Sequence, residues 1–434
     1  MNARKAIEHD IGDLRGLVAR ISEVTERKDF ANDLFANFEG RQGTFLEQEG
    51  ELETAAWKLR GHWLKLAHRS GDSTLKSPSA GHGAQTPDGG YVDFGYEREL
   101  DVSSLERGRS GYSPFIDGWS NDLVVFRSGQ AALAGILHWA MANWSGSAAL
   151  GVQHDGAYFE TRSLLDSWPK RILDRRQGAT DVVIAEPIWC DGHFGRHDPS
   201  LAPRHALIVD TTMVGPGYDI SAHLHGSCPL VLAYSSGLKL DQAGLELANV
   251  GIVRIYARDD AGKDDAGKDG AGKVATLLRS IRALTGTGLT LDELSALSAP
   301  WFMDREYAAG YAAGVFANNR ALGQAVGNHS LLFEPNCHPS LVDTNADAPF
   351  CAFELREPSA ELYKALIVRV EREISRRGLL AKKGGSFGFR GHRYELIEPE
   401  PERGRTFLRV ALGWRDGHSR QGLCELFAEL ANSP

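Results

Sequence analysis

The chain has 434 residues, 42% of them hydrophobic, which suits roughly two or three packed domains. Its formal net charge of −9 argues against a nucleic-acid partner and against a polybasic membrane surface. No apolar run approaches the roughly 20 residues that span a bilayer, and the first residues lack the apolar core of a signal peptide. Five scattered cysteines show no metal-ligand spacing and are interpreted as reduced thiols. We therefore expect a cytoplasmic protein, and its size favours an enzyme.

Residues 1–95 are predicted to form a helical extension followed by a linker. Apolar residues recur at three- and four-residue spacings through 11–25 and 51–69, which is the period of an amphipathic helix. The stretch 70–90 is rich in Gly, Ser and Pro and indicates a surface loop.

Short β-rich segments alternate with helical ones from about residue 120, which predicts a doubly wound α/β domain over 96–345. Strands that are apolar on both faces belong to helix-covered parallel sheets. Such runs begin at Ala148, Asp181, Ala206, Leu230 and Val250. Within this domain, 258–274 contain the repeated unit DDAGK-DDAGK-DGAGK, which predicts a disordered loop. Residues 346–434 read as a smaller α+β domain.

A lysine and an acid follow two of these candidate strands. Lys239 lies in the turn after the run that begins at Leu230, and Asp210 ends the run that begins at Ala206. Pyridoxal 5'-phosphate (PLP) chemistry needs such a pair, because a lysine forms an imine with the cofactor and an acid keeps the pyridine nitrogen protonated. Considered singly, Lys239 could be a solvated charge and Asp210 a helix cap.

A small-residue turn, Ser128-Gly129-Gln130, joins a strand-like run to a strongly helical segment. Free backbone N–H groups and the positive end of the helix dipole make such a turn suitable for a phosphate. A simple N-cap is the alternative interpretation.

Taken in order, these landmarks resemble those of fold-type I PLP-dependent enzymes, and within them the cysteine/methionine-metabolism branch of cystathionine synthases and lyases. The resemblance covers about 95–434 and rests on Ser128-Gly129-Gln130, Tyr158-FETR, Asp210-TT, Ser236-GL-Lys239 and Arg409. It implies a mixed, mostly parallel sheet with helices on both faces, and a PLP cofactor. It also implies a small amino-acid substrate and a homodimer or homotetramer with a shared active site.

For the cofactor phosphate, the resemblance implies binding by the backbone of Ser128, Gly129 and Gln130 and by the hydroxyl of Ser236, with Ser235 as an alternate. In the branch that this chain resembles, a Tyr-x-Arg unit lies at a similar sequence distance before the phosphate-binding turn and contacts the cofactor phosphate of the neighbouring subunit. Tyr96 and Arg98 match that unit.

For the cofactor ring, the resemblance implies that Tyr158, in a Tyr-x-x-Thr unit with Thr161, stacks on the pyridine, a flat surface on a flat electron sink. An ordinary strand aromatic and a competing His154 remain alternatives. Asp210 would pair with the ring nitrogen, with Thr212 hydrogen bonding nearby.

For the substrate, the resemblance implies that Arg409 binds the α-carboxylate, with Ser386 as the counterpart of a family serine; a solvent-facing arginine is the alternative. Arg390, His392 and Arg393 depart from the family pattern and could contact an acidic or bulky substrate.

Further departures lie after Glu186, where the family has Asn-Pro, and after Lys239, where it has Gly-His-x-Asp. Histidines crowd the first of these regions, but no His-x-x-x-His pattern accompanies them, so no metal is expected. They are His193, His197, His223 and His225, beside Trp189.

The resemblance favours elimination at the β- or γ-carbon, or substitution at the γ-carbon, of an amino acid. S-adenosylmethionine or activated homoserine would be suitable substrates, and the altered loops favour specialised biosynthesis. A PLP-dependent aminotransferase is the alternative, because it shares these landmarks. A non-catalytic protein of the same fold is the third interpretation.

Overall fold

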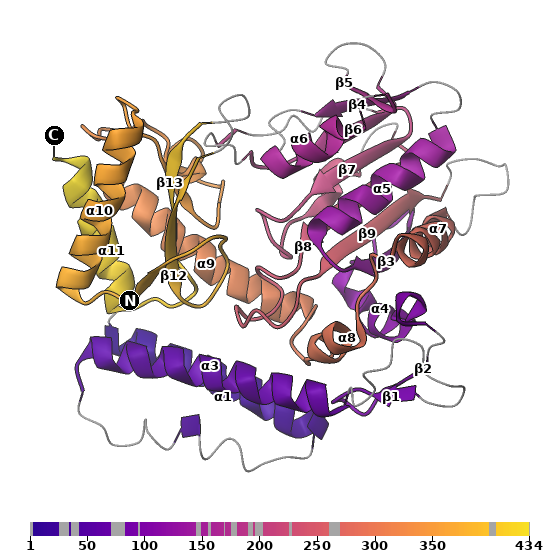
Figure 1. The fold of residues 1–434 in the computed structure, drawn as a ribbon, viewed down its shortest axis with the longest axis horizontal. Coiled ribbons are helices and arrows are strands. Elements are labelled where there is room, and N and C mark those ends of the chain that lie inside the picture. The colour runs from indigo at the N-terminus through magenta and orange to yellow at the C-terminus, as the bar shows by residue number, and fades with distance from the viewer. Residues whose placement is uncertain are drawn as a thin grey trace.

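The structure is a computed structural model, and its main parts are a seven-stranded sheet, a four-stranded sheet and a pair of long helices that lies along both (Figure 1). No helix among the described residues is long and apolar enough to cross a membrane. The residues described are 3–25, 34–35, 43–70, 83–93, 96–144, 149–154, 158–168, 170–174, 180–189, 194–195, 203–224, 228–259, 270–398 and 405–433.

The large sheet has the order β3-β9-β8-β7-β6-β4-β5, and the five strands from β8 to β5 run parallel. β9 is antiparallel to both of its neighbours, so the sheet is mixed and mostly parallel, as the resemblance implied. The five strands expected from apolar runs are all present. The bounds are β3 (Trp119–Phe126), β4 (Leu150–His154), β5 (Ile172–Asp174), β6 (Val182–Ala185), β7 (Ala206–Asp210), β8 (Leu230–Ser236) and β9 (Gly251–Arg258).

Both faces of this sheet are covered, because successive side chains of a strand point to opposite faces. Val124 of β3 joins one core cluster with α5 (Gly129–Trp144) and α7 (Gly270–Thr285). Its neighbours Leu123 and Val125 join another cluster on the opposite face, which includes α8 (Leu291–Leu297). Two further helices in this region are α4 (Ser103–Gly108) and α6 (Phe159–Asp166).

The predicted disordered loop over 258–274 is wrong at its ends. Arg258 still belongs to β9, and α7 begins at Gly270, so that Ala271 is fully buried. Small residues allow this, since a Cβ on Gly270 would lie 3.0 Å from the Cβ of Ala257. Residues 260–269 lie outside the described residues.

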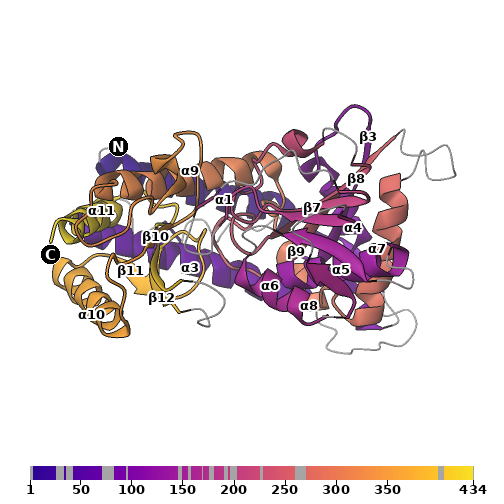
Figure 2. The ribbon, with the colours of Figure 1, turned by 90° about the horizontal axis from the view of Figure 1, so that it is seen from above.

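The small sheet has the order β10-β13-β12-β11, with β12 antiparallel to β13 and parallel to β11. Two helices, α10 and α11, share its core. The long helix α9 (Arg305–Val326) connects the two sheet regions (Figures 1 and 2). The bounds are β10 (Cys351–Phe353), β11 (Ala381–Lys383), β12 (His392–Ile397), β13 (Phe407–Ala411), α10 (Ala360–Arg377) and α11 (His418–Ala431).

The two helices predicted near the N-terminus are confirmed as α1 (Ala3–Thr25) and α3 (Phe45–Ser70), which pack against each other. Their apolar stripes are buried in the same cluster as α8, and the indole Nε1 of Trp63 donates to the carbonyl of Ala296 at 2.7 Å. The expected loop over 70–90 contains, in its described part, one strand of a hairpin. That hairpin pairs β1 (Gly83–Gln85) with β2 (Tyr91–Asp93).

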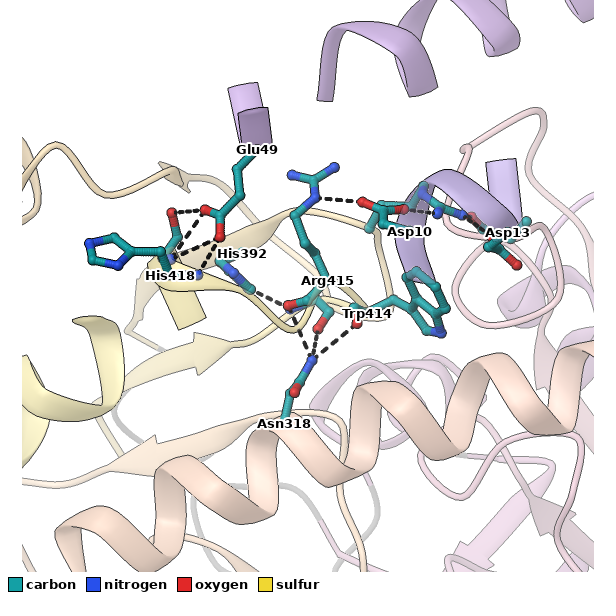
Figure 3. A network of polar contacts seen from close by, with 12 residues as sticks. Asp10, Asp13, Glu49, Asn318, His392, Trp414, Arg415 and His418 are labelled. Carbon is teal, nitrogen blue, oxygen red and sulfur yellow. Dashed lines mark hydrogen bonds and ion pairs between the residues drawn. The ribbon is translucent and has the colours of Figure 1, made fainter. Parts of the chain in front are cut away.

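Polar side chains of the two N-terminal helices also contact the small-sheet region (Figure 3). Asp10 pairs with both Arg390 and Arg415, and Glu49 accepts hydrogen bonds from the backbone N–H groups of His418 and Ser419 at the start of α11. Burial alone would raise the pKa of Asp10, but the two guanidinium groups outweigh it and hold that pKa below its ordinary value. The N-terminal helices are therefore attached to both sheet regions.

Candidate active site

A cavity of about 180 Å³ lies at the carboxyl ends of β6, β7 and β8, with part of its wall from the small-sheet region. In open α/β sheets, this edge is where ligands bind. The predicted residues that line it are Ser128, Gly129, Gln130, Tyr158, Asp210, Thr212, Ser236, Lys239 and Arg409.

Asp210 and Lys239 reach the cavity from neighbouring parallel strands. Asp210 is the last residue of β7 and lies opposite Tyr234 of β8, and Lys239 follows in the turn after β8. The Lys239 Nζ atom is 4.6 Å from the centroid of the Phe387 ring. The backbone N–H of Thr212 donates to Asp210 Oδ1 at 2.9 Å, which orients the acid.

The turn before α5 forms the N-cap that its sequence allowed. The Ser128 hydroxyl accepts a hydrogen bond from the Ala131 N–H at 3.1 Å, so it caps the helix. The N–H groups of Gly129 and Gln130 are the first of the helix and have no intrahelical acceptor. Gly129 packs on the end of β8, where a Cβ would lie 3.3 Å from the Cβ of Ser236. The helix N-terminus is thereby placed next to the Ser236 hydroxyl.

Successive side chains of β8 point to opposite faces of the sheet, and this distinguishes Ser236 from Ser235. Ser236 lines the cavity, and its N–H donates to the Thr212 hydroxyl at 3.0 Å. Ser235 is buried and does not line the cavity, because it points to the other face of the sheet.

Tyr158 lines the cavity from the N-cap position of α6. Its backbone N–H donates to Glu186 Oε1 at 2.5 Å, and its ring centroid is 4.3 Å from that of Phe159. His154, at the end of β4, and the fully buried Thr161 do not line the cavity.

Sequence reasoning missed several lining residues. Glu186 directly follows β6, Asp210 is the last residue of β7, and Tyr234 lies two residues before Ser236, so strand position and period were available signals. Burial, together with the nearby carboxylates of Asp210 and Glu186, raises the pKa of the Tyr234 hydroxyl well above its ordinary value. No local signal identified the lining residues Glu160, Ile188, Met213, Phe350 and Phe387.

Arg409 reaches the cavity from β13 of the small sheet, and its guanidinium pairs with Glu395 of β12. Ser386 does not line the cavity; its backbone N–H donates to the same carboxylate at 3.1 Å.

The idea that three residues near Ser386 contact the substrate is wrong, because none of them lines the cavity. Arg390 is buried against Asp10, and the Arg393 guanidinium pairs with Glu246 at 2.6 Å. His392 is buried, and its Nδ1 accepts from the Gly413 N–H at 3.0 Å. These side chains instead connect parts of the protein.

Tyr96 and Arg98 lie on the exposed surface, where the Arg98 guanidinium is 5.3 Å from the Tyr96 ring centroid, and neither lines the cavity. Contact with a second subunit remains a prediction for them.

The described residues contain no cluster of histidines, cysteines and acids suited to a metal ion. His223 is buried and contacts the Tyr218 hydroxyl at 2.8 Å, and Trp189 lies before the gap at residue 190. His193, His197 and His225 lie outside the described residues. Four cysteines, Cys228, Cys337, Cys351 and Cys424, are buried and free.

No model of a known protein family matches the sequence, and no curated protein matches it. Solved structures do match. Methionine gamma lyase CalE6 from Micromonospora echinospora is 18% identical with a TM-score of 0.52, over 85% of this chain and 99% of that one.

Two further matches each cover 85% of this chain. Cystathionine gamma synthase from Xanthomonas oryzae pv. oryzae is 14% identical over 99% of its length, and cystathionine gamma-lyase from yeast is 12% identical over 97%. Both have a TM-score of 0.54. The chain has the fold of the fold-type I PLP-dependent enzymes.

Proposed function

We propose that this protein is a PLP-dependent enzyme that acts on an amino acid. The observation that carries the proposal is the convergence of Lys239, Asp210 and the N-terminus of α5 on one cavity. A lysine, an acid and an anion-binding helix end are separate requirements of this cofactor, and all three are met in this cavity.

The residues fit the cofactor in their donor chemistry. The Gly129 and Gln130 amides and the Ser236 hydroxyl would hold the phosphate, and the absence of a side chain at Gly129 lets the helix end approach β8. Asp210 would hold a proton on the ring nitrogen, and Tyr158 would lie against the ring.

When bound, PLP would withdraw electrons from the α-carbon of the substrate. Lys239 Nζ would hold the cofactor covalently, and once released would take the substrate α-proton and return it. Arg409 would fix the substrate carboxylate and thereby the orientation of the bond that breaks. Phe350 and Phe387, both buried, would exclude water from this side of the cavity.

For the reaction, we favour β- or γ-elimination or γ-substitution, with S-adenosylmethionine or activated homoserine as candidate substrates in specialised biosynthesis. The names of the methionine gamma lyase, cystathionine gamma synthase and cystathionine gamma-lyase structures support this class. The alternatives are an aminotransferase and a non-catalytic protein of this fold. We also propose that the protein is cytoplasmic and forms a homodimer or homotetramer. Each chain would consist of an N-terminal extension (1–95), a large domain (96–345) and a small domain (346–434).

The cofactor assignment is tested by borohydride reduction of the protein loaded with PLP, followed by peptide mass mapping. The pyridoxyl group is expected on the peptide that contains Lys239. Lys239→Ala should remove this label, whereas Lys383→Ala, at a surface lysine paired with Glu371, should keep it. Failure of the wild-type protein to take up PLP, or a label on another lysine, would overturn the assignment.

The reaction class is tested by incubation with candidate amino acids in the absence of a keto-acid acceptor. Continuous release of ammonia, a keto acid or a substituted product supports elimination or substitution. A single stoichiometric change in cofactor absorbance, followed by arrest, supports the aminotransferase. Full cofactor occupancy with no spectral response to any substrate supports the non-catalytic protein.

A further inference from the structure

Arg409 is held by one oxygen of Glu395. The Arg409 Nε atom donates to Glu395 Oε1 at 2.8 Å, and Nη2 donates to the same oxygen. The Ser386 backbone N–H donates to Oε1 as well, at 3.1 Å. The Arg409 and Glu395 side chains are 12% and 21% exposed, so the pair is largely shielded from water.

The strand register places this pair. Glu395 and Arg409 lie directly opposite each other on β12 and β13, where side chains of an antiparallel pair share one face. Beyond the pair, the Arg409 guanidinium carbon is 5.2 Å from the ring centroid of Phe350, which also lines the cavity. Glu395 therefore holds one edge of the Arg409 guanidinium, and Phe350 limits where that group can lie.

The loop before β12 is shaped around the same carboxylate. Ser386 has a φ of +71°, which is unfavourable for a residue with a side chain, and its N–H points at Glu395. A Cβ at the preceding Gly385 would lie 3.1 Å from Glu395 Oε2, so a larger residue there would crowd the carboxylate. Phe387 follows and lies beside the Lys239 amine.

Glu395 itself does not line the cavity, whereas Arg409 does. Glu395 engages the Nε and Nη2 atoms of Arg409, and Nη1 makes no hydrogen bond with any residue that the structure describes. A guanidinium held along one edge can offer its other edge to a second carboxylate, because its donors form a rigid planar fork.

We propose that Glu395 is a positioning residue for substrate binding. It fixes Arg409 so that the free edge meets the substrate carboxylate, and it couples Arg409 to the loop that brings Phe387 against Lys239. This inference rests on the proposed function, since it takes Arg409 as the carboxylate-binding group. Glu395 was not among the residues that the sequence indicated.

The test compares two ligands that differ by one carboxylate, norleucine and pentylamine. Their affinities for the PLP-loaded protein are measured by calorimetry and by the change in cofactor absorbance. For Glu395→Gln, which loses the charge, we expect norleucine to bind about ten- to a hundredfold more weakly, the range of one charged hydrogen bond. Pentylamine affinity should stay within about threefold, because no carboxylate is involved.

Two comparisons separate positioning from a general structural effect. Glu371→Gln removes a surface acid paired with Lys383 and should leave both affinities unchanged. In an Arg409→Met background, Glu395→Gln should have no further effect on norleucine, because both substitutions act through one group. If Glu395→Gln prevents folding, Glu395→Asp, whose side chain is one methylene shorter, should lower norleucine affinity selectively in the same way.

Equal weakening of both ligands would overturn the proposal, and so would tighter norleucine binding, which would make Glu395 a competitor of the substrate. Ligand-observed NMR can measure the binding of butyrate, a simple carboxylate, to Arg409 in cofactor-free protein. Glu395→Gln should weaken this butyrate binding. A protein that takes up no PLP but shows this butyrate response would refute the proposed function and leave the role of Glu395 intact. If PLP uptake is normal but Glu395→Gln changes neither butyrate nor norleucine binding, the role of Glu395 is refuted and the proposed function is left intact.

Discussion

Asp10 of the first helix and Arg390 of the small-sheet region form a buried ion pair across 380 positions of the chain. Arg390 also pairs with Asp13 at 2.7 Å. Two residues earlier, the Gly388 carbonyl accepts from the Tyr311 hydroxyl at 3.1 Å. The N-terminal helix therefore holds the loop that brings Phe387 into the cavity.

Removing the charge of Asp10 should destabilise the protein strongly. Asp10→Asn leaves the buried guanidinium groups of Arg390 and Arg415 without their shared carboxylate, which we expect to lower the free energy of unfolding by about 3–5 kcal/mol. Glu8→Gln, on the same helix but in an exposed pair with Arg4, should change it by less than about 1 kcal/mol. Denaturant titration measures both, and similar small effects would show that the buried pair contributes little.

Glu49 should stabilise α11 from outside that helix. Its carboxylate accepts from the N–H groups of His418 and Ser419, where the helix dipole also favours a negative charge. Glu49→Gln is expected to cost about 1–2 kcal/mol and to speed hydrogen exchange in the first turn of α11. Glu53→Gln, which breaks a pair with the exposed Lys382, should leave that exchange unchanged. Unaltered exchange in the Glu49 variant would contradict the prediction.

Gly388 should be required for the position of Lys239. Its φ is +80°, and a Cβ there would lie 2.9 Å from the Lys239 carbonyl oxygen. Gly388→Ala is expected to displace the lysine turn and to weaken PLP uptake as well as stability. The control is Gly378→Ala, because Gly378 has a similar φ of +68° at the end of α10. The atom nearest to a Cβ there is 3.5 Å away, in Leu46. Gly378→Ala should cost about 1 kcal/mol of stability and leave PLP uptake unchanged, and equal uptake by both variants would refute the steric argument.

Two buried histidines should make the protein sensitive to acid. Burial, reinforced by Arg415 and Arg420, lowers the pKa of His392 to about 3, and burial lowers that of His338 to about 4. The unfolded chain takes up these protons first, so the free energy of unfolding falls as the pH drops from about 6.5 toward 4.

The His392 contribution to that fall can be measured by substitution. Over this pH range each histidine should account for roughly 3 kcal/mol. His392→Asn keeps an acceptor for the Gly413 N–H and should reduce the slope of stability against pH. The same substitution at the exposed His329 serves as the control. An unchanged slope in the His392 variant would show that this histidine is not buried in its neutral form.

If Tyr96 and Arg98 complete the site of a second subunit, inactive variants should complement each other. Lys239→Ala and Arg98→Ala, each inactive alone, are mixed under conditions that exchange subunits. Hybrid dimers then contain one site with both residues intact, so activity should return. A mixture that stays inactive although subunits exchange would show that Arg98 does not complete the site of the second subunit.

The sequence by itself determined five strands of the large sheet and the two long N-terminal helices. The family resemblance added Ser236, whereas Asp210 and Lys239 were identifiable because apolar runs that are buried on both faces end at the same edge of a parallel sheet. This is local information, carried by composition and periodicity over a few residues.

Only the tertiary structure decided which charged side chains face the cavity and which hold the protein together. Substrate contact was considered for both Arg390 and Arg409, yet Arg390 is buried against Asp10 and Arg409 lines the cavity beside Glu395. The reason is physical: the role of an arginine depends on which carboxylate lies within reach. Sheet register and the docking of a distant helix set that distance, and no local pattern encodes either.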